Sequence, residues 1–241
     1  MKGILDDRNL PPELARSLER RHFLRFAAAG TVLTALGGGT WVLAQPEDPR
    51  GKQKRPDGRA RLPPGQRILD ALKPMGGEPG DPSPSGFRLK VYGDVEAPFE
   101  VDFAGLLEMP QTDLTCDVHC VTGWSAFDVK WTGVQVAHLA KVAKLREGVR
   151  HVIFEAANGY TANVRLAEAT APSVMVVHKL FGNAIPRPHG PPVRSLVPDL
   201  YFWKSAKWLT GVRFSKVDRP GYWETRGYNN HADPWLEERY S

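Results

Sequence analysis

The chain has 241 residues and a formal net charge of +5, from 32 Lys and Arg against 27 Asp and Glu. This mildly basic balance lacks a run of Lys or Arg interleaved with aromatic residues, so it argues against a nucleic-acid partner. Two cysteines exclude a dense disulfide scaffold, and the length suffices for one domain with a substantial core.

The first predicted element is an export signal. Arg20 and Arg21 are adjacent, an aromatic-aliphatic pair follows, and residues 26–44 carry no charge. This order is typical of a twin-arginine signal, so residues 1–44 are predicted to direct export of the folded protein to the periplasm. The apolar run is also close to the roughly 20 residues of a membrane span. An uncleaved N-terminal membrane anchor is therefore the alternative.

Residues 45–86 are predicted to form a linker. Of the 41 residues from 46 to 86, 16 are Pro or Gly, and charges of both signs are scattered among them. Such a composition buries too little apolar surface to fold alone. Only residues 67–73 have a helical pattern, and the last part of the linker is expected to lie along the domain surface.

Periodic structure begins at residue 87. Residues 87–93 alternate as in a strand, Asp102 is a plausible cap for a short helix, and residues 134–145 form an amphipathic helical pattern. Short segments rich in β-branched and aromatic residues are predicted to be strands: 151–156, 160–166, 173–180, 193–198 and 207–217. Together they predict a single α+β domain, mostly β, over residues 87–241.

Both cysteines lie in one predicted strand. Because side chains alternate along a strand, Cys116 and Cys120 point to the same face as Leu114 and Val118. A disulfide between them is the structural alternative. A thiol-redox protein using the pair is a functional one, although such proteins usually carry C-x-x-C at a helix start.

Two stretches carry a family resemblance. Residues 120–125 (CVTGWS) followed by 131–134 (WTGV) resemble the molybdenum-ligand segment of the sulfite oxidase family of molybdopterin oxidoreductases. Residues 189–198 (HGPPVRSLVP) followed by 204–208 (KSAKW) resemble that family's pterin-binding segment. The resemblance covers roughly residues 87–241 and includes short bacterial members such as the periplasmic methionine sulfoxide reductases.

The resemblance implies a molybdenum–molybdopterin cofactor, whose dithiolene is completed by one protein thiolate. Cys120 would be that ligand, since a thiolate suits a redox-active metal. Cys116 fits as a small buried residue. Residues implied to contact the pterin or its phosphate are His189, Arg194, Lys204, Ser205, Ala206 and Lys207, with Ala156 acting through its backbone.

The resemblance also bears on the substrate. Tyr160 is implied as a hydrogen-bond donor to the substrate or the reacting oxygen. Sulfite oxidases place an arginine soon after the ligand cysteine, whereas residues 121–125 contain no cation. His119, Trp124 and Trp203 are expected to make an aromatic pocket. A sulfoxide-type oxo compound is therefore favoured over sulfite.

The reaction requires a redox partner. The chain has no C-x-x-C-H motif for covalent haem, so a cytochrome or a membrane haem protein is expected to exchange electrons with the cofactor.

Three cations elsewhere in the chain can supply the charge missing after Cys120: Arg165, Lys179 and Arg187. A non-catalytic binding module on the same fold is the remaining alternative.

Overall fold

A computed structural model describes residues 32–35, 39–42, 48–76 and 83–241. The predicted export signal lies mostly outside these residues. Within it, β1 (Val32–Ala35) and β2 (Gly39–Val42) form an antiparallel hairpin. Pro49–Ser241 form a compact unit that is separate from the one containing β1 and β2. No helix in the described part of the chain is long and apolar enough to cross a membrane.

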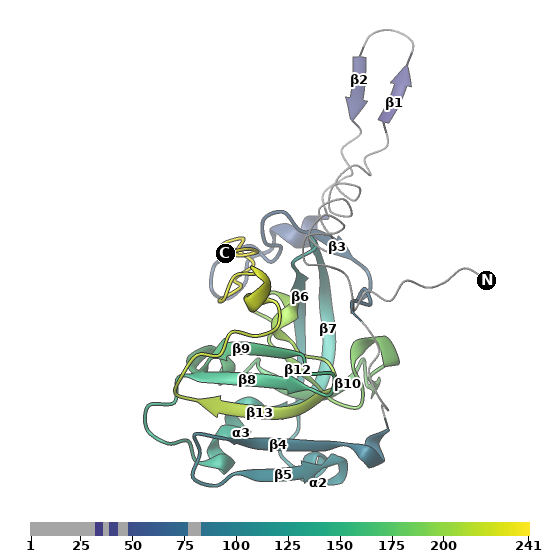
Figure 1. Cartoon of the computed structure of the whole chain (residues 1–241). Coiled ribbons are helices and arrows are strands. Elements are labelled where there is room, and N and C mark those ends of the chain that lie inside the picture. Colours follow the sequence, from purple (N-terminus) through teal and green to yellow (C-terminus); the bar gives the residue numbers. More distant parts are fainter. Residues whose placement is uncertain (1–31, 36–38, 43–47, 77–82) are drawn as a thin grey trace, which may run out of the picture. The chain divides into compact units, whose positions relative to one another are not determined.

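One sheet of the compact unit at Pro49–Ser241 has six strands (Figure 1). Both cysteines lie in its strand β6. β7 is its central strand, with β6 and β10 paired antiparallel to it and β3 parallel to it, while β11 and β12 pair with β10. The strands are β3 (Arg67–Leu69), β6 (Thr112–Cys120), β7 (Trp124–Gln135), β10 (Met175–Leu180), β11 (Asn183–Ala184) and β12 (Arg194–Leu196).

A second sheet has the order β5-β4-β13-β8-β9. Its strands are β4 (Arg88–Gly93), β5 (Phe99–Asp102), β8 (His151–Ala156), β9 (Thr161–Arg165) and β13 (Leu209–Ser215). β4 and β13 are parallel and the other neighbours are antiparallel. The larger apolar cluster joins the two sheets, because it contains Val134 and Val176 from the first and Leu89, Phe154 and Phe214 from the second.

Helices are few and short. α2 (Phe103–Glu108) begins where the Asp102 carboxylate accepts a hydrogen bond from the Gly105 amide at 2.9 Å, which confirms the predicted cap. α3 (Val136–Ala143) buries one face, and α4 (Leu166–Ala169) is a single turn. The 3₁₀ turns are η2 (Pro49–Lys52), η3 (Pro84–Gly86), η4 (Arg187–His189), η5 (Phe202–Lys204) and η6 (Glu224–Arg226). The predicted mostly-β fold class is confirmed.

The compact unit begins at Pro49, well before the predicted domain start at residue 87. Residues 67–69 pair as a strand with β7 instead of forming the predicted helix. The Arg61 guanidinium binds the Asp117 carboxylate at 2.6 and 2.7 Å. Residues 49–76 are thus held by a distant strand and by ion pairs, so they are not a free tether. Composition reports neither of these long-range contacts.

Candidate active site

Cys120 is the last residue of β6, at a tight turn into β7. The turn closes through a hydrogen bond from the Gly123 amide to the Cys120 carbonyl at 3.0 Å, and Gly123 has a φ of 85°, which favours glycine. The Cys120 Sγ lies 3.2 Å from the Thr122 hydroxyl and is largely buried. Burial raises the pKa of the Cys120 thiol. Coordination to a metal would remove that proton.

The predicted face of β6 is confirmed, since Leu114, Cys116, Val118 and Cys120 share one apolar cluster. Neither cysteine is in a disulfide. Residues four apart in a strand are separated by about 13 Å, whereas disulfides need Cα atoms within about 7 Å. The geometry therefore argues against a redox pair made of Cys116 and Cys120.

His119 points to the opposite face of β6, because neighbouring residues alternate. Its Nδ1 lies 2.8 Å from the Ser125 hydroxyl, and its ring packs edge-on against Trp235 with centroids 4.9 Å apart. Burial lowers the pKa of His119 to about 3. The structure thus places the His119 side chain against Ser125 and Trp235, on the opposite face of β6 from Cys120. Trp124 does belong to the cluster that contains Cys120.

Arg194 is a buried cation on β12, with 2% of its surface exposed. Its guanidinium donates to the carbonyls of His189 at 3.0 Å and Ser205 at 2.9 Å. It also lies over the rings of Trp131 and Phe202, which belong to or pack on the Cys120 cluster. Among the described residues no carboxylate pairs with it, and burial lowers its pKa to about 9. A buried cation of this kind favours an anionic ligand.

Lys207 and His189 lie beside Arg194. The Lys207 ammonium donates to the carbonyls of Met75 and of Pro188, the latter at 3.1 Å. Gly190 lets these segments approach, because a Cβ there would sit 2.4 Å from the Lys207 Cβ. Burial, followed by the charges of Arg194 and Lys207, lowers the pKa of His189, so its imidazole favours the neutral form. The three predicted residues thus form one basic group.

The backbone amides expected to cradle the phosphate are partly engaged. The Ser205 amide donates to the Phe202 carbonyl at 3.1 Å, and the Ala206 amide donates to the Ser195 hydroxyl at 2.7 Å. These two donors are therefore used within the fold. Ala156 lies opposite Leu209 at the end of β8, and its amide donates to the Tyr160 carbonyl at 2.9 Å.

Tyr160 is partly buried between the sheet and the C-terminal residues. Its hydroxyl donates to the Trp203 carbonyl, so the proton expected to reach a substrate is directed into the protein. Burial raises the pKa of this hydroxyl well above its usual value. Its ring lies 5.7 Å from that of Tyr222. The oxygen lone pairs remain able to accept a hydrogen bond.

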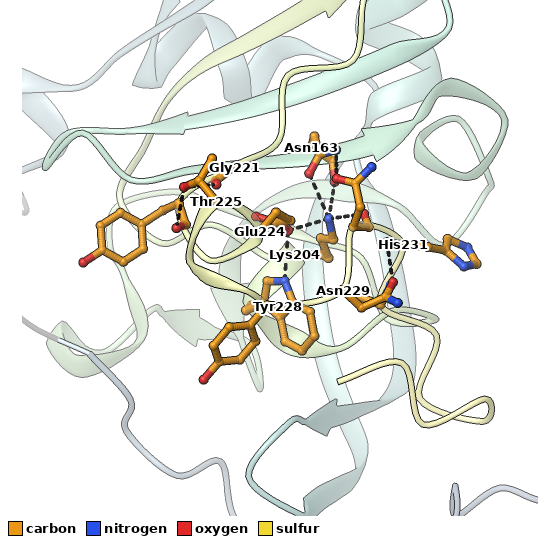
Figure 2. A network of polar contacts seen from close by, with 12 residues as sticks. Asn163, Lys204, Gly221, Glu224, Thr225, Tyr228, Asn229 and His231 are labelled. Atoms are coloured by element: carbon orange, nitrogen blue, oxygen red, sulfur yellow. Dashed lines mark hydrogen bonds and ion pairs between the residues drawn. The ribbon is translucent and has the colours of Figure 1, made fainter. Parts of the chain in front are cut away.

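Lys204 is placed differently from the prediction. Its ammonium is fully buried and lies 2.5 Å from the Glu224 carboxylate. It also donates to the Asn163 side chain and carbonyl at 2.9 Å and to the Asn230 carbonyl at 2.8 Å (Figure 2). An ammonium has three donors, so these oxygens leave none for a cofactor. Lys204 thus anchors the C-terminal residues to β9, away from its predicted place at the cofactor.

Three residues around the Cys120 turn were missed by the sequence reasoning. Gln66 Nε2 donates to the Cys120 carbonyl at 3.1 Å, and the Arg67 amide donates to the Gly123 carbonyl at 3.1 Å. Arg239 Nη1 donates to the Val121 carbonyl. These donors come from both ends of the compact unit, and no local motif marks them.

Residues 76–223 match the model of the oxidoreductase molybdopterin binding domain family. The chain belongs to this molybdopterin-binding oxidoreductase family. The oxidoreductase YuiH of Bacillus subtilis (strain 168) is 36% identical over 193 residues, which is 79% of this chain and 98% of that protein. The resemblance to sulfite oxidase-like molybdopterin enzymes is therefore confirmed, and the chain is a molybdenum-dependent oxidoreductase by family.

The chain is also similar to a more distant relative in sequence and to a solved structure in fold. The protein-methionine-sulfoxide reductase catalytic subunit MsrP of Ralstonia nicotianae is 28% identical over 165 residues, covering 62% of this oxidoreductase and half of that protein. The sulfane dehydrogenase SoxCD of Paracoccus pantotrophus has a similar structure, with a TM-score of 0.56 at 16% identity. That likeness covers 98% of this chain and 62% of the SoxCD chain.

Proposed function

We propose that this oxidoreductase is exported by the twin-arginine route to the periplasm and transfers an oxygen atom to or from a small oxo compound. A sulfoxide-type substrate is favoured over sulfite, and an external haem protein exchanges the electrons. One observation carries the proposal: Cys120 and Arg194 both contact the same apolar cluster. Cys120 belongs to it, and the Arg194 guanidinium, which has no carboxylate partner among the described residues, lies over one of its rings, Trp131, and over Phe202, which packs against it. A thiolate and a buried cation are what a metal on an anionic pterin requires.

The residues fit the molybdenum–molybdopterin cofactor in the following way. Cys120 would hold the metal, and Arg194, Lys207 and His189 would bind the pterin and its phosphate. When bound, the cofactor supplies the two-electron change that oxygen-atom transfer requires. The buried setting of Cys120 excludes water from the thiolate and favours its coordination over solvation.

The substrate preference rests on charge. Residues 121–125 contain no cation. The turn at residues 120–123 is closed by a backbone hydrogen bond from the Gly123 amide to the Cys120 carbonyl. A dianion in a partly desolvated pocket needs fixed counter-charges, whereas a neutral sulfoxide needs only a hydrogen-bond donor. The name of the relative MsrP, a protein-methionine-sulfoxide reductase subunit, points to the same substrate class.

The test is a metal analysis followed by kinetics. The purified full chain should contain about one molybdenum per polypeptide, and it should reduce dimethyl sulfoxide with an artificial electron donor. Turnover of this neutral compound should exceed oxidation of sulfite with an artificial acceptor at matched concentrations. A chain without molybdenum after expression in a host that makes the cofactor would support the non-catalytic module. Efficient sulfite oxidation with no sulfoxide turnover would overturn the substrate assignment.

A further inference from the structure

Residues distant in sequence donate hydrogen bonds to the backbone carbonyls of the turn at residues 120–123, which contains Cys120. The carbonyls of residues 120, 121 and 123 accept hydrogen bonds from Gln66, Arg239 and the Arg67 amide, respectively. All three donors lie outside residues 76–223, which match the family model. Cys120 therefore lies within the residues that match the family model, whereas the three donors to the turn around it lie before or after those residues.

Arg239 is the charged member of this set. Its side chain is 16% exposed, and the guanidinium carbon lies 5.2 Å from the centre of the buried Tyr201 ring. Gly65 leaves room for it, since a Cβ at that position would be 3.2 Å from Arg239 Nη2. A guanidinium has five N–H donors. Among the described residues, one of these makes a hydrogen bond, to the Val121 carbonyl.

The structure also shows where the other candidate cations lie. Arg165 is exposed and lines a small cavity with Asp218 and Glu168. Lys179 is exposed on β10, and Arg187 is exposed on η4. Arg239, by contrast, binds the residue that directly follows Cys120.

The charge of Arg239 is partly balanced. The Glu237 carboxylate lies 3.8 Å from Arg239 Nη2 and is half exposed. The pair has no net charge but still directs N–H donors, so it suits a neutral, strongly polarised oxygen better than a dianion. A sulfoxide or N-oxide oxygen is such an acceptor.

We propose that Arg239, which the C-terminal residues bring to the turn at residues 120–123, is the specificity-determining cation of this site and donates a hydrogen bond to the oxygen of a neutral oxo substrate. The proposal rests on the proposed function and names the residue that selects its substrate. Arg239 thereby takes the place of the cation that is absent from residues 121–125.

The experiment compares the full-length holoenzyme with Arg239→Gln, which keeps a donor for the Val121 carbonyl but loses the charge. Binding of dimethyl sulfoxide to the oxidised protein, without electron donor, is measured by titration, and KM and kcat are measured with donor. We expect the dissociation constant and KM to rise about tenfold to a hundredfold, the range of a charge-assisted hydrogen bond. Molybdenum content and melting temperature should stay near those of the wild type. Arg239→Lys should fall between the two.

Arg226→Gln is the matched control, because Arg226 also donates to a carbonyl, that of Tyr222, and stacks on a tyrosine ring in the same C-terminal stretch. It should leave binding and KM unchanged. Glu237→Gln should lower KM for sulfite relative to that for dimethyl sulfoxide, because the site then carries a net positive charge.

Unchanged binding and KM in Arg239→Gln would overturn the proposal. Loss of molybdenum in that variant would also overturn it, because Arg239 would then act by holding the turn. Failure of the proposed function looks different: the wild-type chain would lack molybdenum or would not turn over dimethyl sulfoxide. The binding titration still tests Arg239 in that case, and a wild type that binds no dimethyl sulfoxide refutes both.

Discussion

Replacing Arg194 with methionine should release the cofactor while leaving the fold intact. Burial of the guanidinium lowers the pKa of Arg194 from its usual value to about 9. At 1.36 kcal/mol per pKa unit, this lowering corresponds to an electrostatic cost of about 5 kcal/mol for the charged form. An anionic pterin phosphate that neutralises the charge can recover much of this cost. The expected loss of cofactor affinity is therefore on the order of a thousandfold.

The cofactor-free variant should not be strongly destabilised. Removing the guanidinium leaves the carbonyls of His189 and Ser205 without a donor, at roughly 1–3 kcal/mol each, and this offsets the relief of the buried charge. The lowered pKa of Arg194 also predicts how the stability difference between the wild type and Arg194→Met depends on pH. The cost of the buried charge is present in full below pH 9 and declines as the pH rises above 9, so the wild type should gain stability relative to Arg194→Met in that alkaline range.

The assay is reconstitution of the cofactor-free chain with a concentration series of molybdenum–molybdopterin, followed by metal analysis and pterin fluorescence. Urea unfolding of each cofactor-free protein checks the fold. Arg213→Met is the control, since Arg213 lies on β13 in the second sheet, over the Tyr92 ring. An Arg194→Met protein that retains molybdenum within threefold of wild-type affinity would refute the reasoning.

Three other changes test the remaining assignments. Cys120→Ser should abolish activity and molybdenum binding in a folded protein, because a hydroxyl is a poor ligand for a soft metal site, whereas Cys116→Ser should keep most turnover; the reverse pattern would exchange their roles. Lys204→Met should lower the free energy of unfolding by about 3–5 kcal/mol, because it strands the buried Glu224 carboxylate; urea unfolding showing a loss below 1 kcal/mol would contradict the buried pair. Changing both N-terminal arginines at positions 20 and 21 to lysine should trap a folded, cofactor-loaded protein in the cytoplasm, and normal export on fractionation would exclude the twin-arginine route.

Local patterns were sufficient to predict much of the fold. The strand at residues 88–93, the Asp102 cap and the helix beginning near Val136 follow from alternation and capping, which involve residues within a few positions of each other. The shared face of Cys116 and Cys120 follows from the same two-residue period. The same period also places His119 on the other face, although the expected aromatic pocket had included it.

The sequence by itself determined the family, and it predicted the metal-ligand cysteine and the basic residues of the pterin segment, because each lies in a contiguous motif. Only the tertiary structure decided which charges are buried and what they meet. Lys204 pairs with Glu224 and donates to Asn163, and Arg239 donates to the Val121 carbonyl, 118 positions away in sequence. Side-chain periodicity sets the face on which a residue lies, but its partner depends on which distant segment packs there. That packing is a property of the whole core, and no local stretch encodes it.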